Sequence, residues 1–272
     1  MEFLKDLLGA HYKESSFFLF AGPCVVENTE VLQETATYLI EICQQLNIPL
    51  VFKSSFTKAN RSSVRSFTGI GREKALALLA EIGSKYSIPL VTDIHTDEDA
   101  IIAANYVDVL QIPAFLCRQT SLLLAAGNTG KAVNIKKGQF LSPEGMEFAI
   151  QKVQSTGNEK VLLTERGTTF GYQDLIVDFR SIPIMKQFHK PVLMDCTHAL
   201  QQPNQASGVT GGQPQYIEMI AKCAIVAGAD GLFIETHPNP SKALSDGANM
   251  LDLKQMKPML ERLVKIKNAM QE

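Results

Sequence analysis

The feature that most constrains the fold is a regular alternation of short apolar runs with longer stretches of helical periodicity. Eight runs of five or six residues, each followed by polar residues, have the length and composition of buried strands. These runs are residues 17–21, 49–53, 89–93, 107–112, 132–136, 161–165, 191–195 and 231–235. The intervening stretches with helical spacing include residues 29–46, 72–86 and 215–227.

Apolar strands that alternate with helices indicate a parallel sheet whose faces are covered by those helices. Eight such units within a chain of this length predict a closed (β/α)8 barrel, an α/β fold of the TIM-barrel type, that forms a single domain over residues 1–272. A doubly wound open sheet is the rival. Its Gly-rich first turn is missing, because AGPC at 21–24 does not match GxGxxG.

The barrel prediction restricts where function can lie, since active sites of such barrels form at the carboxyl ends of the strands. Six cations follow the predicted strands there: Lys53, Lys58, Arg61, Arg118, Lys136 and Arg166. Lys and Arg donors that face a cleft suit phosphate or carboxylate. Six cations suggest two phosphates, or a phosphate and a carboxylate, although any single one can instead be a solvated loop residue.

A second group carries side chains that bind metals. Cys24, His198 and Glu235 follow the first, seventh and eighth runs, which become neighbours only if the barrel closes, and Asp246 lies in the last loop. This mixed sulfur, nitrogen and oxygen set suits Zn²⁺, Fe²⁺, Mn²⁺ or a similar divalent ion, with no organic cofactor indicated. The alternatives are an inert buried thiol, a core histidine and loop carboxylates in salt bridges.

Two further readings of single residues remain open. Lys53 or Lys136 ends a strand and could be the Schiff-base lysine of an aldolase. Cys43 and Cys223 fall in helical stretches and are expected to lie in the core. No GxSxG elbow supports a serine hydrolase.

Charge and cysteine usage exclude several classes of partner and compartment. The chain has 26 basic and 28 acidic residues, so nothing favours nucleic acid or an anionic membrane surface. No apolar stretch approaches the roughly 20 residues of a membrane span, and the first residues lack a signal peptide's apolar run. Five scattered cysteines without a CxxC pair predict a reducing, cytoplasmic location.

Nine segments, in order, carry a resemblance to a known family. They are AGPCVVE (21–27), FKSSFTKANRSS (52–63), TDIH (92–95), LQIPAFLCRQT (110–120), NIKKGQF (134–140), ERGTTFGY (165–172), DCTHALQ (195–201), FIETHPNP (233–240) and LSDGANML (244–251). Together they resemble the 3-deoxy-D-manno-octulosonate 8-phosphate synthase family from about residue 17 onward.

This resemblance implies a (β/α)8 barrel that assembles as a homotetramer. It also implies an aldol-type condensation of phosphoenolpyruvate with D-arabinose 5-phosphate and water, which gives 3-deoxy-D-manno-octulosonate 8-phosphate and phosphate for lipopolysaccharide synthesis. Members of the family divide by the residue at the position of Cys24, where metal-dependent members carry Cys and metal-independent members carry Asn. The resemblance therefore implies the metal-dependent class, with Cys24, His198, Glu235 and Asp246 as ligands.

The family also implies roles for the pocket residues. Lys58, Lys136 and Arg166 would hold phosphoenolpyruvate, with Gln111 beside them. Arg61 and Ser62 would bind the sugar phosphate, and Arg118 would reach it from a neighbouring subunit. Lys53 and Asn60 would contact the sugar near its reactive end, and Asp93 with His95 would handle protons or support the site.

Two alternative functions are weighed against this one. The related 3-deoxy-D-arabino-heptulosonate 7-phosphate synthases use erythrose 4-phosphate, but they carry a KPRT-type sequence where this chain has KANR at 58–61. A non-catalytic sensor on a barrel scaffold is the other alternative, and the intact cation and metal sets count against it.

Overall fold

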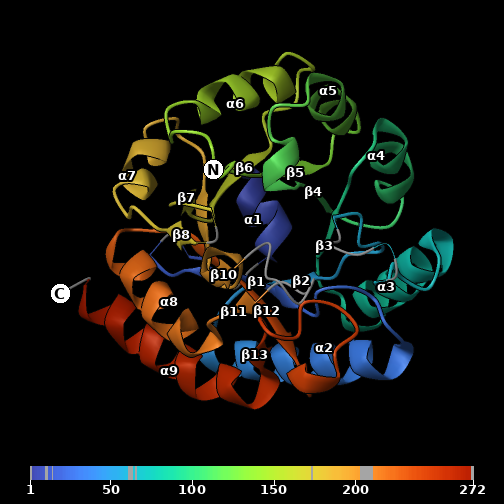
Figure 1. The fold of residues 1–272 in the computed structure, drawn as a ribbon, viewed down its shortest axis with the longest axis vertical. Coiled ribbons are helices and arrows are strands. Elements are labelled where there is room, and N and C mark those ends of the chain that lie inside the picture. Colours follow the sequence, from blue (N-terminus) through green and yellow to red (C-terminus); the bar gives the residue numbers. More distant parts are fainter. Residues whose placement is uncertain are drawn as a thin grey trace.

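Eight parallel strands close into a barrel. The computed structural model describes residues 2–9, 12–13, 15–60, 64, 66–172, 174–202 and 211–270. Each barrel strand pairs in parallel with the next one along the chain, and the last pairs with the first to close the ring (Figure 1). The strands are β1 (Phe18–Gly22), β2 (Leu50–Lys53), β3 (Leu90–Asp93), β4 (Val109–Ile112), β5 (Ala132–Lys136), β6 (Val161–Glu165), β9 (Val192–Asp195) and β12 (Gly231–His237). The predicted (β/α)8 fold is confirmed.

Helices surround the ring and cover its outer face (Figure 1). They are α2 (Thr29–Leu46), α3 (Arg72–Tyr86), α4 (Asp97–Ala103), α5 (Thr120–Asn128), α6 (Met146–Gln154), α7 (Ser181–Lys186), α8 (Ile217–Val226) and α9 (Leu253–Ala269). Short 3₁₀ turns lie at Ala114–Leu116, His198–Leu200, Pro214–Tyr216 and Pro240–Lys242. No helix among the described residues is both long and apolar enough to span a membrane.

The predicted and observed boundaries differ for simple physical reasons. Three predicted runs begin at Pro49, Pro89 and Pro191, whereas the strands begin one residue later. Proline has no N–H to donate to the sheet. The last strand runs on to His237 because it also pairs with β13 (Leu251–Asp252).

The helical ranges 29–46 and 72–86 match α2 and α3, and a side-chain cap fixes the start of α2. The Asn28 side chain accepts a hydrogen bond from the Val31 N–H at 2.8 Å. The prediction that Cys223 lies in the core is wrong, since this residue is exposed. It falls beside the buried stripe of α8, which contains Ile220 and Ala224.

Side chains of the barrel strands alternate between its interior and the helix layer. In β1, Phe18 and Phe20 face inward, while Leu19 and Ala21 join the layer between strands and helices. The inner cluster continues around the ring through Val51, Val91, Val109, Ala132, Leu162, Leu193 and Phe233. The part of the barrel interior nearer the amino-terminal ends of the strands is therefore a packed apolar core rather than a channel.

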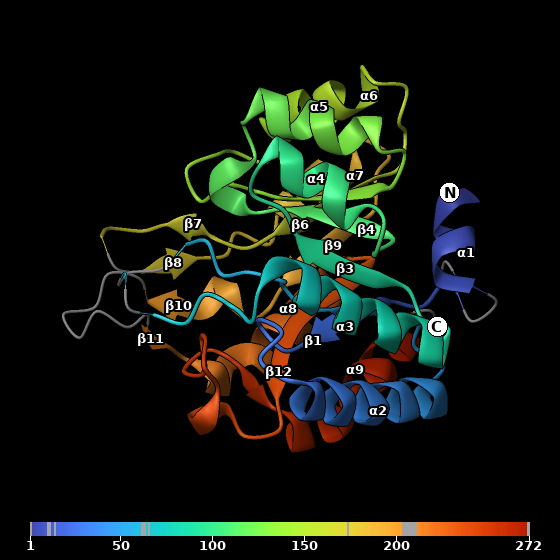
Figure 2. The same ribbon diagram turned by 90° about the vertical axis from the view of Figure 1, so that its right-hand side faces the viewer.

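Helix α1 (Glu2–Leu8) closes the amino-terminal end of the barrel (Figure 2). Leu4 and Leu8 are buried and belong to the same cluster as the inward-facing strand residues. Two antiparallel pairs lie at the opposite end, β7 (Thr168–Thr169) with β8 (Leu175–Ile176) and β10 (Gln201–Gln202) with β11 (Gly211–Gly212). Helix α1 therefore covers the amino-terminal end of the barrel, and the carboxyl-terminal mouth is where we expect the site.

Candidate active site

The alternation that fills the barrel with apolar side chains continues into a polar layer nearer the mouth. Two residues after the inward-facing Val51 comes Lys53, and two residues after Val91 comes Asp93. The corresponding positions of the other strands carry Gln111, Asn134, Thr164, Asp195 and Glu235. Because strand side chains alternate with a period of two, these polar and charged side chains form a layer directly above the apolar core.

A pocket opens above this layer. It is lined by Lys53, Ser55, Thr57, Lys58, Asn60, Asp93, His95, Pro113, Ala114, Phe115, Lys136, Gln139, Arg166, His198, Gln201 and Glu235. Most of the predicted site residues that the structure describes therefore meet in one cavity.

Lys53 lies fully inside the barrel and is held by acceptors from β12 and from the loop after β1. Its Nζ donates to Glu235 Oε1 at 2.5 Å and to the Cys24 carbonyl at 2.8 Å, and lies 3.8 Å from Asp93 Oδ2. Burial alone would lower the pKa of Lys53, but Glu235 and Asp93 raise it well above its usual value. Lys53 is therefore a charged donor at the base of the pocket.

Lys136 is the second buried lysine. Its Nζ contacts Asp195 Oδ2 at 2.6 Å and stands 3.6 Å from the ring centroid of Phe233. The same Asp195 oxygen lies 2.7 Å from His198 Nδ1. Burial opposes ionisation of Asp195, but His198 and Lys136 outweigh it and hold its pKa well below the usual range.

Arg166 differs from the lysines because its contacts are neutral. Its Nη2 donates to the His198 carbonyl at 3.1 Å and to Gln201 Oε1 at 2.8 Å. Within the described part of the chain, no carboxylate oxygen forms an ion pair with this guanidinium. Burial lowers the pKa of Arg166, against the opposing effects of nearby carboxylates. Among the described residues, Arg166 is thus a desolvated cation without a direct counter-ion, the arrangement expected of an anion-binding residue.

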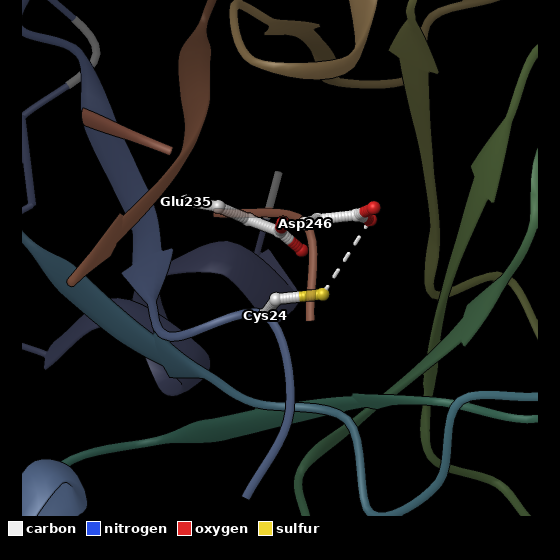
Figure 3. A group of neighbouring side chains, drawn as sticks. All are labelled: Cys24, Glu235 and Asp246. Carbon is white, nitrogen blue, oxygen red and sulfur yellow. Dashed lines mark hydrogen bonds between the residues drawn. The ribbon is translucent and has the colours of Figure 1, made fainter. Parts of the chain in front are cut away.

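Three predicted metal ligands converge on one side of the mouth (Figure 3). One ligand atom each of Cys24, Glu235 and Asp246 lies within 4.8 Å of the others. Cys24 Sγ is 3.7 Å from Asp246 Oδ2. These residues come from the loop after β1, from β12 and from the loop after β12, which the closure of the barrel brings together.

The electrostatics of this group favour a cation. Burial and the charges of Glu235 and Asp246 raise the pKa of the Cys24 thiol to about 12, although Lys58 and Lys53 act in the opposite direction. The ammonium of Lys58 contacts Asp246 and lies 3.1 Å from the Cys24 sulfur. Glu235 Oε2 is buried and receives no hydrogen bond from the residues that the structure describes. Sulfur and carboxylate donors with one buried oxygen left unsatisfied fit a divalent ion.

His198, the fourth predicted ligand, lies at the edge of this group. Its Nε2 is 3.4 Å from Glu235 Oε2, but it falls outside the set in which all ligand atoms lie within 4.8 Å. Asp195 holds the other ring nitrogen, as outer carboxylates commonly do for metal-binding histidines. The role of His198 as a ligand stays a prediction.

The remaining predicted residues lie in three different places. Asn60 and His95 line the pocket. Gln111 is fully buried beneath it, and its amide donates to Asp93. Arg118 is exposed and lies away from the pocket of its own barrel. Arg61 and Ser62 lie outside the described residues.

Sequence reasoning missed several polar residues that border the site or support it. Gln139 and Gln201 line the pocket, and Ser55 Oγ donates to Asp93 Oδ2 at 2.6 Å. Asn134 and Thr164 are buried in strand interiors. The signal that could have found these last two is the inward register, because each precedes a predicted site cation by two residues, Lys136 and Arg166.

Fold and site together define a class, a (β/α)8-barrel enzyme with a pocket lined by Lys and Arg side chains at its carboxyl-terminal mouth. The chain belongs to the DAHP synthetase I family, which it matches over residues 9–272.

Curated relatives are similar over nearly the whole chain. A 2-dehydro-3-deoxyphosphooctonate aldolase of Koribacter versatilis (strain Ellin345) is 48% identical over 255 residues, which cover 93% of this chain and 91% of the relative. Proteins of the same name from Syntrophobacter fumaroxidans (47% over 261 residues; 96% and 91% covered) and Legionella pneumophila strain Corby (49% over 250 residues; 92% and 91% covered) are similarly close. The family resemblance deduced from the nine segments is confirmed.

Proposed function

We propose that this enzyme condenses phosphoenolpyruvate with D-arabinose 5-phosphate and water, and releases 3-deoxy-D-manno-octulosonate 8-phosphate and inorganic phosphate. The observation that carries the proposal is the buried Arg166, which has no direct counter-ion among the described residues. It lines one pocket together with Lys136 and with Glu235 of the group of Cys24, Glu235 and Asp246. The name shared by relatives at 47–49% identity favours this reaction over the seven-carbon alternative.

Phosphoenolpyruvate carries a phosphate and a carboxylate, and the pocket offers a matching set of donors. Arg166 presents a fork that can bind one of these groups through two parallel hydrogen bonds. Lys136 and Lys58 add point charges on the pocket wall. Both lysines are paired with carboxylates, so the substrate anion competes with Asp195 and Asp246 for them.

The pentose phosphate would bind further out along the loop after β2. Asn60 lines the pocket at the start of this segment and offers an amide to a sugar hydroxyl. Arg61 and Ser62 follow it and are assigned to the far phosphate, with Arg118 contributed by a neighbouring subunit. The aldehyde end would then lie near Lys53.

In the reaction, C3 of phosphoenolpyruvate forms a bond to the aldehyde carbon of the sugar, and the aldehyde oxygen takes up a proton. Water adds at C2, and the bond between C2 and the phosphate oxygen breaks to release phosphate. Lys53, kept charged by Glu235 and Asp93, can donate to the developing alkoxide. Burial lowers the pKa of His95, so its neutral ring can accept a proton.

A divalent cation fits the donor set of Cys24, Glu235 and Asp246, with His198 as a fourth ligand. When bound, such an ion supplies Lewis-acid polarisation of an oxygen or lowers the pKa of a bound water. Asp195 holds the His198 ring beside this group of ligands. Glu235 belongs to the same group and also pairs with Lys53. Zn²⁺, Fe²⁺ and Mn²⁺ all suit this set.

The proposal extends to assembly and location. A homotetramer would give a role to Arg118, which is exposed and does not line the pocket of its own barrel. Large exposed apolar side chains on the loops and helices near the mouth support a subunit interface there: Phe115, Phe140, Phe148, Phe170 and Tyr172. A cytoplasmic location agrees with five free cysteines.

Initial rates of phosphate release separate this reaction from its runner-up. With phosphoenolpyruvate and Mn²⁺ supplied, we expect kcat/KM for D-arabinose 5-phosphate to exceed that for erythrose 4-phosphate by at least about a hundredfold, because a site built to hydrogen-bond the extra hydroxyl is left unpaired by the shorter sugar. The reverse preference would assign the chain to the seven-carbon reaction. Binding of both sugars without phosphate release would favour a sensor.

A further inference from the structure

Four polar side chains form a continuous hydrogen-bonded chain across the inside of the barrel, from β6 to β3. Thr164 Oγ1 donates to Asn134 Oδ1 at 2.8 Å, and Asn134 Nδ2 donates to Gln111 Oε1 at 2.8 Å. Gln111 Nε2 then donates to Asp93 Oδ1 at 2.7 Å. Asp93, Gln111 and Asn134 are also direct partners in the register of β3, β4 and β5.

Burial makes this chain more than an incidental set of contacts. Thr164, Asn134 and Gln111 are all fully buried, at a level where most barrels place Val, Ile or Leu. Buried amides are costly unless both ends find partners, and here each amide is satisfied at both ends. Barrel stability alone does not require such groups at these positions.

The hydrogen bonds all run in one direction, toward the pocket. Burial opposes ionisation of Asp93, but Lys53, Lys136, His95 and a hydrogen bond from Ser55 outweigh it and keep the pKa of this carboxyl well below its usual range. An ionised carboxylate only accepts, so Gln111 must turn its NH₂ group toward it.

The orientation of Gln111 then fixes the next two groups. Its carbonyl faces Asn134, which must in turn present its NH₂ group to Gln111 and its carbonyl to the Thr164 hydroxyl. Loss of the Thr164 donor would leave the buried Asn134 carbonyl without this hydrogen bond. The other bonds of the series would weaken as well, because aligned hydrogen bonds polarise one another.

Asp93 is the member of this hydrogen-bonded series that lies at the pocket. It lines the pocket, and its second oxygen accepts from Ser55 at 2.6 Å and lies 3.8 Å from Lys53 Nζ. A rotation of the Asp93 carboxylate would therefore shift the ammonium assigned to the aldehyde oxygen.

We propose that Thr164 and Asn134 are positioning residues of the reaction, which act through Gln111 to hold the Asp93 carboxylate and, with it, Lys53. This inference rests on the proposed function for its assay. Neither Thr164 nor Asn134 lines the pocket, so we expect their effect on turnover rather than on substrate binding.

Two variants at position 164 separate hydrogen bonding from packing. T164V keeps the volume and loses the hydroxyl, and T164S keeps the hydroxyl and loses a methyl group. We expect T164V to lower kcat about tenfold with KM for both substrates changed by less than about twofold, and T164S to stay within about twofold of the parent enzyme. A purely packing role predicts the opposite order.

A double-mutant cycle then tests whether the effect passes through Gln111. In a Gln111→Met background, T164V should lower kcat by less than about twofold further, because the link it acts through is already absent. If T164V does not fold, N134L takes its place in the same cycle, with the same tenfold and twofold expectations.

The outcomes distinguish this inference from the proposed function. Full activity of T164V, or additive losses in the cycle, would overturn the positioning role while leaving the reaction intact. Absence of phosphate release by the parent enzyme would overturn both.

Discussion

Substitution of Arg166 by Met should lower kcat/KM for phosphoenolpyruvate by at least about a hundredfold, because each charge-assisted hydrogen bond contributes about 1.5–3 kcal/mol and the guanidinium fork can form two. Steady-state kinetics with each substrate varied in turn measure this. The KM for the pentose phosphate should change far less, since Arg166 is assigned to the other anion.

Stability provides an independent check of this variant. Arg166 is a buried cation whose hydrogen bonds, among the described residues, go to neutral acceptors on His198 and Gln201. Its removal should therefore not lower Tm. Arg180 is the matched control: it is exposed, pairs with Asp178, and R180M should leave kinetics unchanged. Equal losses for both substrates in R166M would show that the two anion sites are wrongly assigned.

Substitution of Cys24, which we propose as a metal ligand, should have the second large effect. We expect exhaustive chelation to abolish turnover and added Mn²⁺, Zn²⁺, Fe²⁺ or Co²⁺ to restore it. Cys24→Ser should lose most activity and most bound metal while it remains folded, because the change is nearly isosteric and a hydroxyl is a much weaker ligand than a thiolate. Elemental analysis together with circular dichroism measures both outcomes.

Two further variants sharpen this test. Cys24→Asn introduces the residue that the family resemblance assigns to metal-independent members, and it should leave weak activity that survives chelation. Cys223→Ser alters an exposed thiol on α8 and should change neither metal content nor rate. Full activity of the parent enzyme after chelation, with no metal detected, would return Cys24 to the status of an inert buried thiol.

The sequence was sufficient to predict the barrel because its signal is local and repeated. Each apolar run forms a strand within two residues of its predicted start, and the helices α2 and α3 keep their predicted bounds. The amino-terminal plug was not predicted. Leu4 and Leu8 form a narrow apolar stripe in a charged segment. This stripe becomes part of the core because it packs against the open amino-terminal end of the barrel.

The site was predictable as a set of residues but not as a set of pairs. The predicted strand ends alone are enough to place Lys53, Lys136 and Glu235 at one mouth of the barrel. That Glu235 binds Lys53 while Asp195 binds Lys136 depends on the shear and closure of the barrel, which no local pattern encodes.

The polar residues within strands were missed for a related reason. Asn134 lies between Val133 and Ile135, and Thr164 follows Leu163. These apolar neighbours face the helices, so both runs look like uniformly buried strands. Only the inward register, two residues below Lys136 and Arg166, marks them as part of the site.

Product analysis tests the central claim most directly. The enzyme, supplied with Mn²⁺, phosphoenolpyruvate and D-arabinose 5-phosphate, is incubated to completion and the products are resolved by mass spectrometry. The proposed reaction predicts one eight-carbon sugar-acid phosphate and one inorganic phosphate for each phosphoenolpyruvate consumed. Formation of pyruvate with the pentose phosphate unchanged would contradict it. So would the absence of an eight-carbon product with Mn²⁺ and with each of Zn²⁺, Fe²⁺ and Co²⁺ in its place.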